Sequence, residues 1–305
     1  MDEIRKLADA VLYEGYILWP YRRSALKNQK RWTFGGVFPP SHSAEHPDDR
    51  SEIQAQCLLE HDGEPDVDAR VRFLHVIERR IARDGELVDE ATVAGERHLA
   101  WDEATERELL DGTIDLPAGR VVEPVGDGVE IVRTWESLRG RIDVDVEATD
   151  ERLSTVTVRV ANETPWRGHD REGALRRTFC STHIVLRTEA GAFVSPLEAV
   201  DRCENVGVWP VLVGEEGDRQ TILASPIILD EYPRIAPESP GDLFDAGEID
   251  RLLIVNVLSM SEAEQEEMRA TDPRVREILE RCAALGPEEL LPLHGAIREF
   301  KVSEA

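Results

Sequence analysis

The alternation of apolar and polar residues between positions 142 and 160 constrains the fold more than any other pattern in the sequence. Valine or isoleucine alternates with acidic residues over 142–146, and valine alternates with polar residues over 156–160. A turn is expected between them, at 149–152. Successive residues of a β-strand point to opposite faces of the sheet. The pattern therefore predicts a β-hairpin with one buried and one exposed face.

Further strands are expected on both sides of this hairpin. Before it, 53–60 and 69–81 are predicted to form a hairpin with a long loop, and another strand is expected at 92–99. After it, strands are expected over 179–187, 192–195, 209–214 and 219–229. These antiparallel hairpins indicate a sandwich-like or barrel-like arrangement.

Helices are expected near the two ends and once in between. Residues 2–12 carry apolar side chains at helical spacing. Residues 102–110 are also predicted to be helical, with Asp102 as the N-cap. The apolar run 252–258 is predicted to be a strand. Near the C-terminus the pairs Asp245/Glu248 and Ser261/Glu264 have capping-box spacing, Asp272-Pro273 opens another helix, and a last helix is expected to end near Phe300.

The predicted fold class is α+β, β-rich in its first two-thirds and helical toward the C-terminus. Four units are expected: an α+β unit at 1–112, a linker at 113–128, a β-rich unit at 129–229, and a Pro-rich crossover with helices at 230–305. The linker is predicted from its content of Gly, Pro and Asp.

Charge restricts the classes of partner. The 305 residues include 62 acids and 36 lysines and arginines, which gives a formal net charge of −26. Such a surface is typical of a protein from a salt-rich cytoplasm, or of a GC-rich genome. It argues against duplex nucleic acid, which needs a broad basic footprint.

Location and redox state follow from simpler features. No apolar run approaches the length of a membrane span, and the charged N-terminus lacks the apolar core of a signal peptide. We therefore expect a cytoplasmic protein that does not enter the membrane. Four scattered cysteines do not make a disulfide framework, so reduced thiols are expected.

One stretch near the N-terminus departs from the acidic background. Residues 20–38 carry five basic side chains and no acid, and aromatic residues are interleaved with them over 13–38. Three interpretations remain open: aromatic core with a basic rim, a protein-contact surface, or stacking platforms for single-stranded nucleic acid. The residues expected to contact a partner are Tyr21, Arg22, Arg23, Lys27, Asn28, Arg31 and Trp32, with Arg234 and Glu238 from a rigid Pro-rich loop.

Three segments bring a known group into view: 10–35 (AVLYEGYILWPYRRSALKNQKRWTFG), 209–214 (WPVLVG) and 225–250, which begins SPIILDEYPRIAPESPG. The chain resembles an accessory protein group encoded near nickel–iron hydrogenases of aerobic, especially actinobacterial, hosts. The resemblance covers nearly the whole chain. It implies a role around hydrogenase maturation, with a hydrogenase subunit or maturation factor as the partner. It implies no activity and no site residues.

Metal sites and catalysis are the rival interpretations. Cys180, His183 and Cys203 are a possible set of nickel or zinc ligands for a metal carrier or metal-dependent enzyme. In a regular strand, however, residues three apart point to opposite faces, so Cys180 and His183 could share an ion only across a bulge or at the end of the strand. Acids between 230 and 250 are a weaker candidate for a hard cation.

The standard nucleotide-binding, nucleophile-elbow and zinc-protease motifs are missing from the sequence. We therefore expect a non-catalytic accessory protein that acts by protein–protein contact and holds no cofactor. The alternatives are a metal-binding protein and a single-stranded nucleic-acid-binding protein.

Overall fold

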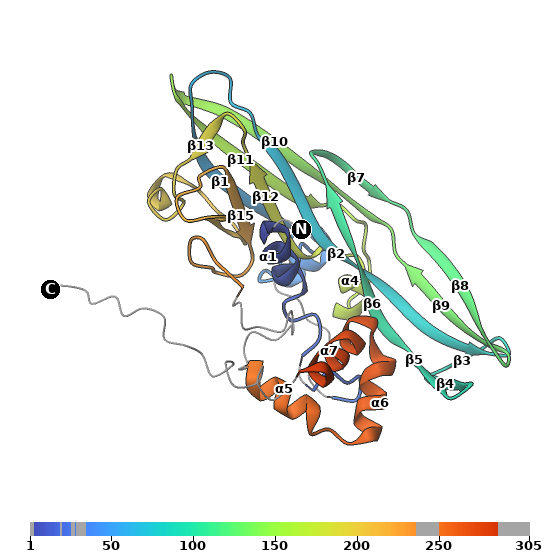
Figure 1. The fold of residues 1–305 in the computed structure, drawn as a ribbon. Coiled ribbons are helices and arrows are strands. Elements are labelled where there is room, and N and C mark those ends of the chain that lie inside the picture. Colours follow the sequence, from blue (N-terminus) through green and yellow to red (C-terminus); the bar gives the residue numbers. More distant parts are fainter. Residues whose placement is uncertain (1–2, 19, 26–27, 29–34, 236–249, 286–305) are drawn as a thin grey trace.

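Two β-sheets packed against each other form the body of the molecule, and the α5–α7 helices gather beside one end of it (Figure 1). The computed structural model describes residues 3–18, 20–25, 28, 35–235 and 250–285. Strands make up 44% of the described residues and helices 21%, which confirms the predicted α+β class. None of the helices in these ranges is long and apolar enough to cross a membrane.

The smaller sheet has five strands and contains the hairpin that the alternation predicts. Its order is β13 (Gly191–Phe193), β1 (Glu52–His61), β11 (Leu153–Asn162), β10 (Leu138–Asp150) and β7 (Gly112–Leu116). β10 and β11 pair antiparallel, with Val144 opposite Val158. Val158 has no exposed surface, because its face of the sheet packs against the second sheet.

The larger sheet is organised around one long strand, β2 (Asp68–Arg83), of 16 residues. Its order is β14 (Trp209–Leu212), β15 (Thr221–Ser225), β12 (Cys180–Arg187), β2, β9 (Val129–Trp135) and β8 (Gly119–Gly126). Along its other side β2 pairs with β6 (Trp101–Leu109) and β3 (Glu86–Val88). β4 (Glu90–Val93) and β5 (Glu96–Leu99) form a separate two-stranded hairpin.

The main core lies between the two sheets. Phe73 of β2 and Phe179, just before β12, stack with ring centroids 4.8 Å apart. Ile142 of β10 and Phe193 of β13 belong to the same buried cluster. This cluster draws residues from both sides of the predicted linker, so the two sheets bury one common apolar interior.

A second buried cluster joins the N-terminal segment to the C-terminal helices. α1 (Glu3–Tyr13) leads into Tyr16 and Tyr21, which pack with Leu74, Trp101 and residues of α5 (Asp250–Leu258), α6 (Glu262–Thr271) and α7 (Pro273–Ala284). Short helices α3 (Pro40–Glu45) and α4 (Arg171–Leu175) and a 3₁₀ turn at Val200–Arg202 are the remaining elements of the described residues.

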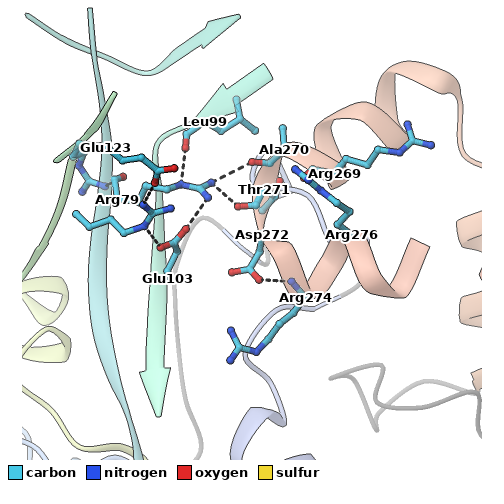
Figure 2. Close-up of polar contacts among 12 residues, drawn as sticks. Arg79, Leu99, Glu103, Glu123, Arg269, Ala270, Thr271, Asp272, Arg274 and Arg276 are labelled. Atoms are coloured by element: carbon cyan, nitrogen blue, oxygen red, sulfur yellow. Dashed lines mark hydrogen bonds and ion pairs between the residues drawn. The ribbon is translucent and has the colours of Figure 1, made fainter. Parts of the chain in front are cut away.

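Caps and one buried arginine hold the helices in place. Ser261 and Glu264 form the predicted capping box of α6, and Asp272 caps α7. Arg79 of β2 donates to the carbonyl oxygens of Ala270 and Thr271, at 3.2 and 2.6 Å, so its charge lies at the C-terminal end of α6 (Figure 2). A cation is favourable there because the last carbonyls of a helix carry partial negative charge.

Four expectations are wrong. The segment predicted as a helix at 102–110 is β6, and the run predicted as a strand at 252–258 is the helix α5. β1 and β2 do not form a hairpin, because they belong to different sheets. Residues 113–128 are not an irregular linker, since β7 and β8 occupy most of them. The predicted cap at Asp245 and the helix to Phe300 lie outside the described residues.

Candidate partner-contact surface

The aromatic residues of the 13–38 stretch that the structure describes are mostly core. Tyr13, Tyr16, Tyr21 and Phe38 are each at most 4% exposed. Tyr13 and Tyr16 meet edge to face with centroids 5.3 Å apart. Tyr13 donates to Glu106 at 2.9 Å, and Tyr16 donates to Asp272 at 2.9 Å. For these residues the core interpretation is the correct one.

The two described basic residues that follow, Arg22 and Arg23, bind acids of the same chain. Arg22 lies 3.0 Å from Glu264 of α6. Arg23 donates to the carbonyl oxygen of Asp89 at 3.1 Å. The Ser24 backbone N–H donates to Glu267 at 2.8 Å. Arg22 and Arg23 therefore help to hold this segment against α6 and the β3–β4 turn.

Two predicted contact residues are corrected by their burial. Tyr21 has no exposed surface, and Asn28 is 5% exposed. Asn28 accepts from the Leu18 N–H and donates to the Leu18 and Arg22 carbonyls, so it closes a local turn. Neither side chain faces a partner. The predicted contact residues Lys27, Arg31, Trp32 and Glu238 lie outside the described part of the chain.

The three segments that carry the resemblance meet in space although they are far apart in sequence. Val11 of α1 packs in one buried cluster with Val211 of β14, and Ile227 borders the same cluster. Gly35 lies so close to Pro226 that a Cβ on it would be 2.1 Å from the Pro226 Cβ. One region of the surface, at the β14 edge of the larger sheet, thus joins all three.

Exposed apolar side chains lie along this region. Trp209 is 45% exposed, Ile228 is 73% exposed and Ile235 is 44% exposed, and Arg234 is exposed beside Ile235. We call these four residues the β14-edge surface. Trp209 pairs in register with Ser225. The Tyr232 N–H donates to the Leu212 carbonyl at 2.8 Å. These two contacts hold residues 225 and 232 against β14.

A cleft of about 1180 Å³ lies beside the middle of the 13–38 stretch. Arg23, Ser24 and Asn28 lie on one side of it, and Trp101 and Leu175 line it as well. Its lining carries four arginines and six acids, so the cleft offers no net positive charge to an acidic partner.

The predicted metal ligands do not come together as one set. Cys180 and His183 do lie on either side of a register shift in β12. Cys180 is buried, and its thiol lies 3.8 Å from the Leu175 carbonyl oxygen. Cys203 lies instead near Cys57 of the other sheet, because the Gln54–Val206 bridge runs this segment along β1. No group of three or more metal-ligating side chains occurs among the residues with described positions.

Burial also sets the protonation of this region. The pKa of His183 is lowered to about 3, first by burial and then by the Arg72 charge. Burial raises the pKa of the Cys203 thiol, and nearby Arg202 opposes this increase only in part. A neutral imidazole and a protonated thiol are the forms expected near neutral pH.

Sequence reasoning missed an arginine-lined pocket at the α6–α7 junction. Its arginines come from β2, β5, β9, α6 and α7, and no spacing in the sequence connects them. It also missed Trp209 and Ile228, although both lie in segments that carry the resemblance. Comparison with protein-family models and with curated proteins gives no match for this chain.

Proposed function

We propose that this chain is a non-catalytic accessory or assembly protein that acts by protein–protein contact in the cytoplasm, in the maturation of a nickel–iron hydrogenase. The single observation that supports contact is that the three resembling segments meet at the β14 edge of the larger sheet, where the four residues of the β14-edge surface are exposed. The hydrogenase context rests on the resemblance of those segments.

The composition of this surface suits binding. Tryptophan and arginine are the residues that most often dominate binding energies, and they act best when surrounded by apolar neighbours that exclude water. Trp209 and Ile228 expose apolar surface to water, and covering that surface with a partner would be favourable in free energy. Pro210 in the edge strand β14 cannot donate a backbone hydrogen bond, which disfavours association by strand pairing. Side chains are therefore the groups expected to recognise the partner.

The test is affinity purification of the tagged full-length protein from its native host, with hydrogenase subunits and maturation factors quantified by mass spectrometry. The variant changes Trp209→Ser and Ile228→Ser together. The matched control is Val121→Ser, because Val121 is 51% exposed on β8, at the opposite edge of the same sheet.

Loss of these side chains should lower recovery of the partner roughly tenfold or more, as expected for one binding hot spot. The Val121 variant should recover as much partner as the unchanged protein. Equal recovery with all three proteins would show that the β14-edge surface is not the contact. A partner that depends on Trp209 but has no relation to hydrogenase would keep the contact role and remove the hydrogenase context.

Charge reversal of the 13–38 stretch is a less direct test. Arg22 and Arg23 already pair with Glu264 and Asp89, so changing them to Glu would also weaken the attachment of α6. Arg234→Glu tests the same electrostatic idea on an exposed residue. If the partner is acidic, this variant should slow association more than dissociation, measurable by surface plasmon resonance.

A further inference from the structure

A pocket of about 250 Å³ lies where the sheet, the β4–β5 hairpin and the α6–α7 junction meet. Basic side chains from five elements line it. They are Arg79, Arg97, Arg133, Arg269 and Arg276, with His98 beside them. This concentration of arginine is unexpected in a chain whose acids exceed its bases by 26.

The acids in the pocket are already engaged. Glu123 accepts from Arg133 at 2.8 Å, and Glu96 accepts from Arg276 at 3.3 Å. Asp272 is 1% exposed and accepts from the Arg274 backbone N–H and from the Tyr16 hydroxyl. These carboxylates hold the pocket's walls in place.

Arg79 is also committed to the fold. It is 7% exposed and donates to Glu103 and to three backbone carbonyls, as Figure 2 shows. Glu103 in turn accepts from Arg133 Nε at 2.8 Å. The floor of the pocket is therefore fixed before any ligand arrives, which lowers the entropy cost of binding.

Three arginines have guanidinium N–H groups that donate to no acceptor in the described chain. Arg97 donates from Nη2 to Glu90 at 2.5 Å, while its Nε and Nη1 make no hydrogen bond. Arg133 uses Nε and Nη1 but not Nη2. Arg276 uses Nε and Nη2 but not Nη1. Unused guanidinium donors thus come from β5, β9 and α7, the walls of one pocket.

We propose that this pocket binds a small phosphate-type oxyanion, either free or as the phosphate group of a small molecule, through Arg97, Arg133 and Arg276. A guanidinium presents paired N–H groups that match phosphate oxygens, and charge-assisted bonds of this kind are the strong ones. The volume suits a ligand the size of pyrophosphate better than a large cofactor. Binding would link β5 and β9 to α7 and hold the helices on the sheet.

Thermal unfolding of the intact protein tests this, in the presence of inorganic phosphate, pyrophosphate, citrate, or sodium chloride at matched ionic strength. A ligand that binds only the folded state raises Tm with its concentration. Phosphate or pyrophosphate should raise Tm by a few degrees with a saturable dependence, and chloride should not. Calorimetric titration of pyrophosphate then gives the dissociation constant.

The variants are Arg97→Gln and Arg276→Gln, and the matched control is Arg141→Gln. Arg141 pairs with Asp143 at 2.5 Å, as Arg97 does with Glu90, but it lies on the five-stranded sheet. Each pocket variant should weaken pyrophosphate binding roughly tenfold, the loss of one charge-assisted contact. The control should bind like the unchanged protein.

Three results would overturn the proposal: an increase in Tm that chloride reproduces, equal binding by pocket variants and control, or a response to citrate without one to phosphate. Circular dichroism of each unliganded variant shows whether it is folded. If Arg276→Gln loosens α7, the Arg97 variant decides, because Arg97 lies on the β5 hairpin outside the helices.

Discussion

His183 has no exposed surface, and the backbone before it departs from a regular strand. Ser181 has φ +56, a left-handed value that is uncommon for a residue with a side chain, and the register of β12 against β2 shifts between Cys180 and His183. His183 Nδ1 lies 3.4 Å from the Ser181 carbonyl, and Nε2 has no partner. An imidazole in this position is costly to protonate, because the charge would be buried beside Arg72.

This burial makes stability depend on pH. The pKa of His183 falls from 6.5 to about 3 on folding, so between these values the unfolded chain binds a proton that the folded chain excludes. Stability is full above the unfolded pKa and decreases as pH falls toward the folded one. From about pH 7 to about pH 5 the expected loss from His183 is about 2 kcal/mol.

Urea unfolding of the His183→Asn variant at both pH values isolates this contribution. The variant's stability should change with pH by about 2 kcal/mol less than that of the unchanged protein, whatever its absolute stability. His169→Asn is the control, since the His169 side chain is 83% exposed. A variant with an undiminished pH dependence would rule out His183 as the source.

At the scale of elements, strands with a clear period of two could be predicted and elements with misleading composition could not. β10 and β11 alternate visibly. Residues 101–109 include three Glu, one Ala, one Arg and one Leu, which favour helix. They nevertheless form β6, because pairing with β2 from Val71 to Arg79 outweighs local propensity. In α5, Ile254 and Val257 favour a strand, yet they are buried on one helical face together with Leu253.

The predicted linker shows the same limit. Its glycines and prolines mark strand ends and an edge, not a flexible connection. Pro124 lies in β8, an edge strand, next to a register shift between Pro124 and Gly126. Composition indicates where a chain bends, but it does not show whether the residues between the bends find a partner strand.

Among the contacts that join β2 and β6 to α6, those of Arg79 should contribute most to stability. Arg79→Met would leave Glu103 without its 2.7 Å partner and the last carbonyls of α6 unsatisfied. Breaking a buried charge pair in this way costs about 3–5 kcal/mol, measured as the free energy of unfolding in urea. Arg141→Met removes an ion pair whose arginine is 52% exposed and should cost less than about 1 kcal/mol. Similar costs for the two variants would contradict a linking role for Arg79.

At the scale of the whole molecule, the net charge could be predicted from the sequence, but the arrangement of the candidate site could not. The charge can be read from composition. The β14-edge surface and the arginine pocket cannot. The segments that present the surface are joined through the buried cluster of Val211 and Ile227, and Arg97 and Arg276 line one pocket, only after folding. The resemblance indicated the segments of the proposed contact surface but not which of their side chains are exposed.

The charge of −26 predicts that salt stabilises the fold. Repulsion among exposed acids acts over many ångströms and is screened as the Debye length falls, from about 20 Å near 0.02 M salt to about 4 Å near 0.5 M. The surface ion pairs weaken as well, but each contributes little. The urea midpoint should therefore rise over this range, equally in NaCl and KCl. A falling midpoint would mean that ion pairs dominate.

The bond from Tyr16 to Asp272 joins residues 256 positions apart, and this separation has a consequence for how the protein is made. At a synthesis rate of about 5–20 residues per second, roughly ten to fifty seconds pass before the partner of Tyr16 is translated. During that time Tyr13, Tyr16 and Tyr21 have no C-terminal helices to cover them. The nascent chain therefore displays an aromatic surface that the finished protein hides, and it should engage ribosome-associated chaperones until α7 emerges.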